Sequence, residues 1–486
     1  MTDPTHLEHL RAELAGPLPH PDPETMRELG DQVLGWVVHH FSSLPEQPIG
    51  LTASRAAMEA LLREPPPEHG CDFARVLADF QEKVAPFAFR VNHPRFLAFV
   101  PGAPTFLSVL GDLLCAGTNF FAGVWLEAAG PSEVELVVLD WFREFLGYPP
   151  EARGVLTSGG SEANLTALLV ARERLTFDER ARAVLYLTAQ RHGSIDRAAA
   201  VIGLRPDQLQ PVPAGADLLL KPAPLAAALR GDRQAGRLPW AVAANAGATN
   251  TGAVDPLAEL GLLCRTERLW LHVDAAYGWP AVLTSEGQAV LDGIAGADSI
   301  TLDPHKWFGQ TFEAGCVLIR DGQRLAATFS MRPDYLQDVE PGGDEINFAD
   351  HGLALSRRFR ALKIWLSVKV LGVSWFRSLV ARSCRLAELA QLLLERAGVF
   401  DILSPRRLSI VCFRYRPPGR ASDEALDHLN LALTGGLRAT GRAFLSSTRL
   451  HGRVALRFCF VNWRTTTSDV EEVVQLLVTI GQRLAR

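Results

Sequence analysis

Short apolar runs alternate with amphipathic patterns through the middle of this chain of 486 residues. Each run ends in small or polar residues and is followed by apolar positions with the spacing of a helix face. This alternation predicts a mostly parallel α/β sheet, in which the carboxyl ends of the strands meet at one edge. The predicted strands cover residues 154–157, 184–188, 241–247, 269–274, 299–302 and 315–320.

The segment before this α/β region has helical patterns but no apolar core of its own. Its main helix is predicted from about residue 24 to 41, because Leu29, Val33 and Trp36 recur at helical spacing. A helical segment without a core has to pack on something else, which is either the main domain or a second subunit. We therefore treat residues 1–91 as a separate N-terminal helical segment.

The end of the chain has a third pattern. A long helix is predicted to stop at Gly372, with one apolar face formed by Leu355, Phe359, Leu362, Leu366 and Val370. Strand-like runs at 408–415 and 453–459 and a final helix after Ser468 follow. We therefore divide the remaining chain into a large α/β domain at 92–372 and a small α+β domain at 373–486.

Composition and charge exclude several classes of function. The net charge is −5 and no long basic block occurs, which disfavours a nucleic acid or an anionic membrane as partner. The sequence contains no apolar run of eighteen residues, and its start lacks the pattern of a secretory signal. The seven cysteines are widely spaced and form no C-x-x-C pair, so we expect no metal site and no disulfide. Reduced cysteines are typical of a cytoplasmic protein, which is the expected location.

Lys306 is the first candidate for covalent chemistry. It is one of only five lysines, and it follows the apolar run 299–302 within the sequence Asp303-Pro304-His305-Lys306-Trp307. A lysine that is desolvated among aromatic residues can lose its proton and form an imine, whereas an arginine can do neither. The alternative is a half-buried structural lysine whose stem packs beside Trp307.

Ser158-Gly159-Gly160-Ser161 lies between a predicted strand and a predicted helix. Glycines let the backbone approach a ligand closely, and the free N–H groups of a helix start favour a phosphate. The segment is not a P-loop, because the required Gly-Lys-Ser/Thr is missing. A structural turn capped by Ser161 is the alternative interpretation.

Three more polar residues follow predicted strands. Asp274 closes a buried run, where a carboxylate needs a cation or strong donors; an ion pair with arginine or a helix cap would serve as well as a protonated pyridine nitrogen. His192 could stack on a ring or move a proton, or it could be structural. Thr249 supplies a small donor at another strand end.

Together these groups meet the needs of pyridoxal 5'-phosphate (PLP). This cofactor requires a lysine imine, a phosphate anchor and a carboxylate that keeps its ring nitrogen protonated. A phosphate cradle, a flat histidine, an isolated aspartate and an imine-competent lysine occur here in that order. A single PLP site explains all four groups more simply than four separate structural roles do.

The sequence resembles the group II PLP-dependent amino-acid decarboxylases, most closely their aromatic-L-amino-acid decarboxylase branch. The resemblance covers nearly the whole chain from about residue 24. It implies a fold of the aspartate-aminotransferase type (fold type I) and a homodimer with active sites at the interface, in which the N-terminal helices embrace the partner. The segments that carry it are His93-Pro94-Arg95-Phe96, Ser158 to Ala163, His192, Leu271-His272-Val273-Asp274-Ala275-Ala276-Tyr277, Pro304-His305-Lys306-Trp307 and Arg357 to Lys363.

The resemblance also assigns roles. It implies that Lys306 forms the imine, that Asp274 pairs with the ring nitrogen and that His192 stacks on the ring. Tyr335 matches the tyrosine of the family's catalytic loop, which reaches the neighbouring subunit's site and protonates Cα after CO₂ leaves; a solvated turn tyrosine is the alternative. The other expected cofactor-binding residues are Gly159, Gly160, Ser161, Thr249, Ala276, Asp303 and His305.

The substrate is inferred from an aromatic segment near the start of the large domain. The expected substrate pocket contains Phe99, Pro101, Phe121, Gly123 and Trp125. These residues suit an aromatic ring and offer no cation for a second carboxylate, which disfavours glutamate and aspartate. Gly123 stands where animal enzymes of the family tend to have phenylalanine, and it is expected to enlarge the pocket.

The expected reaction is loss of CO₂ from an aromatic L-amino acid to give the amine. Asp303 departs from the asparagine usually found at its position, so contacts near the phosphate are expected to differ. Three other functions stay open: an aldehyde synthase of the same family, a decarboxylase of acidic amino acids, and a scaffold without activity. Aldehyde synthases change the loop tyrosine or the stacking histidine, and this chain retains both Tyr335 and His192.

Overall fold

The computed structural model describes residues 4–330, 342–419 and 422–485, and the chain forms two compact units, Met1–Phe89 and Arg90–Arg486. Among its described residues the first unit contains four α-helices. Asp22 caps the longest of them by accepting a hydrogen bond from the N–H of Thr25 at 2.8 Å. No residue of the last three helices is buried, as expected for a segment without its own core. The helices are α1 (Pro4–Glu13), α2 (Pro23–Ser43), α3 (Arg55–Leu62) and α4 (Phe73–Asp79).

The second unit is built around a seven-stranded sheet with the order β1-β7-β6-β5-β4-β2-β3. All strand pairs are parallel except those of β7, which runs antiparallel to β1 and β6. The predicted mostly parallel sheet is confirmed; the short edge strand β3 was not predicted. The strands are β1 (Arg153–Thr157), β2 (Ala183–Leu187), β3 (Leu209–Pro211), β4 (Leu238–Asn245), β5 (Trp270–Asp274), β6 (Ser299–Leu302) and β7 (Gly315–Ile319).

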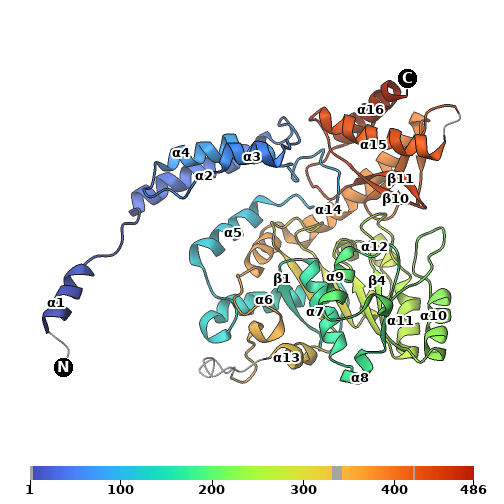
Figure 1. Cartoon of the computed structure of the whole chain (residues 1–486), viewed down its shortest axis with the longest axis horizontal. Helices are drawn as coiled ribbons and strands as arrows, with labels where there is room; N and C mark the ends of the chain where they lie inside the picture. The colour runs from blue at the N-terminus through green and yellow to red at the C-terminus, as the bar shows by residue number, and fades with distance from the viewer. Residues whose placement is uncertain (1–3, 331–341, 420–421, 486) are drawn as a thin grey trace. The chain divides into compact units, whose positions relative to one another are not determined.

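Helices connect these strands and cover the sheet (Figure 1). The helix that follows β1 packs against β5, β6 and β7, with eight of its residues buried. The strands themselves are almost fully buried, which explains why they appear in the sequence as continuous apolar runs. The helices are α5 (Phe106–Thr118), α6 (Trp125–Phe145), α7 (Gly160–Arg172), α8 (Phe177–Arg180), α9 (Gly193–Val201), α10 (Pro222–Gln234), α11 (Leu257–Glu267), α12 (Ser285–Val290) and α13 (Gln323–Phe329).

The long helix α14 (Ala361–Ala397) corrects one prediction. Its helical geometry is broken at Gly372 (φ 73°), as expected, but the helix begins at residue 361, so Leu355 and Phe359 precede it. The buried Arg357 side chain binds Glu135 and the carbonyl of Leu156, and these tertiary contacts override the local helical pattern. By length and composition α14 could also span a membrane, but it packs on α5 and α6 like the core helix of a folded domain.

The C-terminal part contains a second, antiparallel sheet with the order β10-β11-β9-β8. Helices α15 and α16 lie beside β10 and β11 in Figure 1, and a separate cluster of apolar side chains is buried between these elements and α14. Two of its strands, β8 and β10, were not predicted. The elements are β8 (Phe400–Ile402), β9 (Ile410–Tyr415), α15 (Asp423–Ala439), β10 (Ser446–Leu450), β11 (Arg453–Cys459) and α16 (Thr467–Leu484).

Candidate active site

A cavity of about 350 Å³ lies at the carboxyl ends of the central strands. Its size is within the usual range of small-molecule sites. All ten residues that the sequence assigned to the cofactor line it, so segments far apart in the chain meet at one place. The lining consists of Ser158, Gly159, Gly160, Ser161, Asn164, His192, Ser194, Asn245, Gly247, Thr249, Asp274, Ala276, Tyr277, Asp303, His305, Lys306 and Glu313.

The turn between β1 and α7 leaves no room for larger residues. A Cβ atom on Gly160 would lie 2.8 Å from Asp303 Oδ2, and one on Gly315 would lie 2.4 Å from Gly159 Cα. Ser158 donates from both its backbone N–H and its hydroxyl to Glu162, at 2.7 and 2.6 Å. The first N–H groups of α7 are therefore presented close to the cavity, where they suit an anion.

Lys306 is held by a carboxylate. Its Nζ lies 2.9 Å from Asp303 Oδ2, and the Asp303 side chain is almost fully buried. Burial disfavours the ammonium form, but the charges of Asp303 and Asp274 outweigh burial and raise the pKa of Lys306 above its ordinary value. We expected burial among aromatic residues to help Lys306 lose its proton. For the amine without bound cofactor this expectation is wrong, because the two carboxylates raise its pKa. The next side chain, Trp307, is fully buried and stacks on Tyr277.

His305 is a neutral imidazole at neutral pH. Burial lowers its pKa below the ordinary value, and the charge of Lys306 acts in the same direction, while Asp303 opposes them. Its Nδ1 accepts a hydrogen bond from the backbone N–H of Ala314 at 3.1 Å, so its proton resides on Nε2. Nε2 lies 3.7 Å from Asp303 Oδ2, and the ring contacts the cradle near Gly159.

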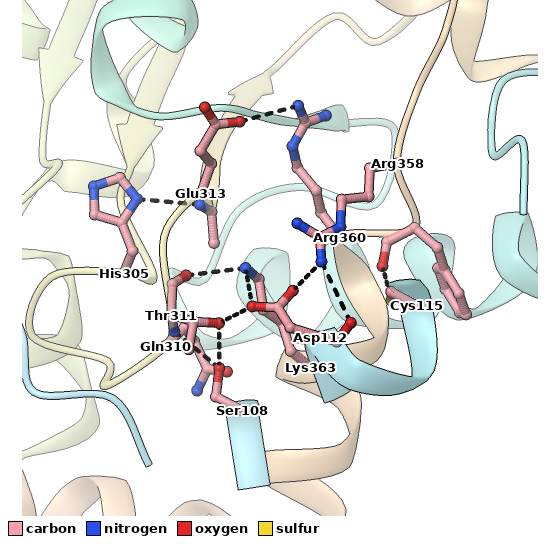
Figure 2. Close-up of polar contacts among 12 residues, drawn as sticks. Ser108, Asp112, Cys115, His305, Gln310, Thr311, Glu313, Arg358, Arg360 and Lys363 are labelled. Carbon is pink, nitrogen blue, oxygen red and sulfur yellow. Dashed lines mark hydrogen bonds and ion pairs between the residues drawn. The ribbon is translucent and has the colours of Figure 1, made fainter. Parts of the chain in front are cut away.

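A polar cluster around the buried Lys363 side chain holds the loop between Lys306 and β7 (Figure 2). Lys363 Nζ donates to the carbonyl of Thr311 at 3.0 Å and lies 3.3 Å from Asp112 Oδ2. The Thr311 hydroxyl donates to the same carboxylate, and Arg358 pairs with its other oxygen at 3.1 Å. Because Ala314 follows three residues after Thr311, this cluster determines where the donor to His305 lies.

Asp274 accepts two hydrogen bonds at the end of β5. The side-chain amide of Asn164 donates to its Oδ2 at 3.0 Å, and the backbone N–H of Ala276 donates to its Oδ1 at 3.1 Å. The carboxylate is 9% exposed and lines the same cavity as Lys306. These two donors orient the nearly buried carboxylate and leave lone pairs for a cation in the cavity.

His192 is the N-cap of α9. Its Nδ1 accepts from the backbone N–H of Ser194 at 3.2 Å and lies 2.8 Å from the Ser194 hydroxyl. Since Nδ1 is an acceptor, the ring proton resides on Nε2. The cap fixes the base of the side chain, while the ring is exposed to the cavity.

The residues expected to bind the substrate side chain are not part of this lining. Phe99, Pro101, Phe121, Gly123 and Trp125 do not line this cavity, and Tyr335 lies outside the described residues. Gly123 is closely packed in this chain, and its effect on the substrate pocket stays a prediction. A Cβ atom there would lie 2.7 Å from the Phe121 ring and 2.8 Å from the carbonyl of Leu355, so this space is already filled.

Sequence reasoning gave no role to several residues that build the site. Asn164 lies on the buried face of α7, and a polar residue on an apolar helix face was the available signal. Arg457 of β11 is 2% exposed and donates to the carbonyls of Thr249 at 2.8 Å and Phe99 at 3.1 Å. Arg457 thereby connects the small sheet to the cavity wall. The only sign of this role in the sequence was a charged residue within the apolar run 453–459.

Comparison with known proteins decides the family. Residues 56–416 match the model of the pyridoxal-dependent decarboxylase conserved domain. The chain belongs to this decarboxylase family. It is 42% identical to the aromatic-L-amino-acid decarboxylase of Bacillus atrophaeus over 463 residues, which cover 95% of this chain and 96% of that protein.

Solved structures of two similar proteins share this fold. The crystal structure of Oryza sativa TDC with PLP and tryptamine superimposes with a TM-score of 0.92 at 27% identity, covering 97% of this chain and all of that one. Rhodiola rosea 4-hydroxyphenylacetaldehyde synthase gives a TM-score of 0.87 at 28% identity over 95% of this chain and 99% of that chain. The chain is a PLP-dependent carboxy-lyase of fold type I.

The cavity fits PLP. Lys306 is the one lysine among the described lining residues, Asp274 offers acceptor oxygens, and the start of α7 offers donors for a phosphate. Asp303 Oδ1 is buried without a hydrogen-bond partner among the described residues, so one polar atom of the lining remains to be satisfied. Every chemical group that the cofactor needs is therefore present at one place.

Proposed function

We propose that the protein decarboxylates aromatic L-amino acids to the corresponding amine and CO₂. The observation that carries this proposal is the convergence of Lys306, Asp274 and His192 on one cavity beside the start of α7. The relatives that act on tyrosine and tryptophan support the aromatic substrate class. They include a tyrosine decarboxylase of Narcissus pseudonarcissus, 30% identical over 90% of this chain, and a tryptophan decarboxylase of Oryza sativa, 30% identical over 94%.

The side chains would divide the work as follows. Bound PLP supplies an electron sink for the charge that departing CO₂ leaves on Cα. Lys306 would hold the cofactor covalently, and Asp274 would keep its ring nitrogen positive. Gly159, Gly160, Ser161, Thr249 and His305 would line its phosphate or ring side, and His192 would lie against its ring. Ala276 and Asp303 would complete the contacts with the cofactor.

The charges of the cavity favour a substrate with an uncharged side chain. Asp274, Asp303 and Glu313 line it, whereas no arginine does so among the described lining residues. A second carboxylate on the substrate would meet these acids without an arginine to balance its charge. A substrate panel of Trp, Tyr, Phe, dopa, His, Glu and Asp, scored by amine and CO₂, tests this. Turnover of glutamate or aspartate above all aromatic substrates would overturn the proposal.

The aldehyde synthases among the relatives define the alternative reaction. They are 4-hydroxyphenylacetaldehyde synthase of Rhodiola rosea and phenylacetaldehyde synthase of Arabidopsis thaliana. We assign simple decarboxylation because Tyr335, at the position of the family's loop tyrosine, and His192 are both retained. Tyr335→Phe should shift the product from amine towards aldehyde and peroxide. An unchanged amine yield would exclude Tyr335 as the donor of the proton to Cα.

The proposal includes a cytoplasmic homodimer. Apolar side chains of α2, among them Met26, Val33 and Val38, are exposed within the described chain, and such a surface favours a protein partner. All seven cysteines are free, in keeping with a reducing compartment. Light scattering after size exclusion tests the assembly: a dimer of about twice 53.0 kDa is expected, and a stable active monomer would refute it.

A further inference from the structure

A chain of buried hydrogen bonds runs behind the cavity and joins Asp274 to His192. It begins at Trp270, whose indole N–H donates to Ser299 Oγ at 2.8 Å. Ser299 Oγ lies 2.9 Å from His272 Nδ1, and His272 Nε2 lies 2.9 Å from Asn164 Oδ1. All four side chains are at most 3% exposed. Of these four, only Asn164 lines the described cavity. Direct contact with a bound molecule therefore does not explain why the other three buried side chains are polar.

Asn164 is the branch point of this chain. Its amide nitrogen lies 3.0 Å from Asp274 Oδ2 and 2.8 Å from Ser194 Oγ. Ser194 in turn meets His192 Nδ1 at 2.8 Å. The two N–H groups of a single amide therefore hold the two residues that we assign to the ring nitrogen and to the ring face.

The direction of every bond follows from donor and acceptor capacity. A carboxylate only accepts, so the NH₂ group of Asn164 must face Asp274 and its Oδ1 must face His272. His272 then carries its proton on Nε2 and accepts from the Ser299 hydroxyl at Nδ1. Burial lowers the pKa of His272 to about 4, although Asp274 opposes this effect, so the ring is neutral at neutral pH.

If the Asn164 amide turned over, its oxygen would face Asp274 Oδ2 at hydrogen-bond distance. Two acceptors would then lie in contact, and the His272 N–H would lose its acceptor. Leaving such groups unpaired inside a protein is strongly unfavourable, most of all when one of them is charged. His272 thus prevents the turn, although it lies one residue layer behind the cavity.

We propose that Asn164 is a positioning residue for Asp274 and His192, and that His272 sets the orientation of its amide. The pair holds the Asp274 carboxylate and the His192 imidazole in place before the cofactor arrives. This inference rests on the proposed roles of Asp274 and His192. It assigns a purpose to a buried histidine and a buried asparagine that take no direct part in the chemistry.

The test measures PLP affinity by titrating cofactor-free protein and following absorbance. Asn164→Asp replaces the shared donor by a second acceptor, and His272→Leu removes the donor that orients it. Each should raise the dissociation constant of PLP by roughly 10- to 100-fold, the range expected for a lost hydrogen bond to a charged group. His272→Gln, whose amide can donate to Asn164 Oδ1, should restore affinity to within about threefold, since that donor contact is the one His272 supplies.

Asn430→Asp is the matched control. Asn430 is also fully buried and donates twice, to the carbonyls of Tyr415 and Leu426, but it lies in the small sheet region. It should lower the melting temperature without changing PLP affinity. Equal affinity in Asn164→Asp and wild type, failure of a folded His272→Gln to restore binding, or a matching affinity loss in Asn430→Asp would each overturn the inference.

Asp274→Asn separates this inference from the proposed function. If Asp274→Asn weakens PLP binding and Asn164→Asp does not, only the positioning role is wrong. If Asp274→Asn binds PLP as tightly as wild type, the assignment of Asp274 to the ring nitrogen fails. A third measurement, the nitrogen-15 NMR shifts of His272, should report a neutral ring protonated on Nε2, and a proton on Nδ1 would contradict the orientation.

Discussion

Replacing Asp303 by asparagine should make the Lys306 amine more reactive in the cofactor-free protein. The two side chains form an ion pair at 2.9 Å, and Asp303 is one of two carboxylates that raise the pKa of Lys306. A lysine with a raised pKa is protonated throughout the neutral range and loses its proton only at higher pH. Removing the negative charge therefore lowers the pKa and increases the neutral fraction at any pH below it.

The size of the effect follows from the distance. Two unit charges 2.9 Å apart attract each other by about 6 kcal/mol at an effective dielectric constant of about 20. Asp274 remains in the variant, the asparagine can still accept a hydrogen bond, and solvent rearranges, so we expect about 1.4–3 kcal/mol of this to be measurable. The neutral fraction of Lys306 should then rise roughly 10- to 100-fold.

The assay is competitive labelling of the cofactor-free protein with an amine-acylating reagent at pH 7, followed by peptide mass spectrometry. The chain has only five lysines, and the exposed Lys221 and Lys369 provide internal controls. Asp303→Asn should speed labelling of Lys306 and leave the two controls unchanged. An unchanged or slower rate at Lys306, with unchanged controls, would refute the electrostatic reasoning.

Three further predictions concern packing, pH and the loop. Gly315→Ala should weaken PLP retention at least tenfold, because its Cβ would lie 2.4 Å from Gly159 Cα, whereas Gly231→Ala, with open space around it, should leave retention unchanged. Between pH 7 and pH 4 the free energy of unfolding of the wild type should fall by about 3 kcal/mol more than that of His272→Gln. The reason is that the pKa of His272 is about 6.5 in the unfolded chain and about 4 in the folded protein, so lowering the pH protonates the unfolded state first. Equal losses in cofactor-free protein would contradict that pKa. Tyr335→Phe should convert amine product into aldehyde, as measured by peroxide release.

The central sheet could be predicted from the sequence because its strands are buried on both faces. Continuous apolar runs such as 299–302 mark strands of this kind, and the chemical groups follow from the rule that they gather at carboxyl ends. The strands that escaped prediction are short or lie at sheet edges. β3 has three residues and ends in Pro211, and β10 is only partly buried, so neither leaves a strong pattern.

The chemistry of the site was less predictable than its location. The sequence pattern predicted that Lys306, Asp303 and Asp274 would lie at one cavity. It did not predict that the two carboxylates would raise the pKa of Lys306 more than burial lowers it. The direction of that pKa shift depends on how close the Lys306 amine lies to two carboxylates: Asp303 in its own loop and Asp274 at the end of β5. Likewise, the start of α14 could not be seen, because the buried contacts of Arg357 with Glu135 join segments more than two hundred residues apart.

Borohydride reduction of the protein purified with its cofactor tests the central claim most directly. Reduction fixes the imine as a stable bond, and peptide mass spectrometry then identifies the lysine that carries the cofactor. We predict one pyridoxyl phosphate adduct, located on Lys306. An adduct on Lys363 or another lysine, or no adduct in a protein that decarboxylates amino acids, would contradict the account.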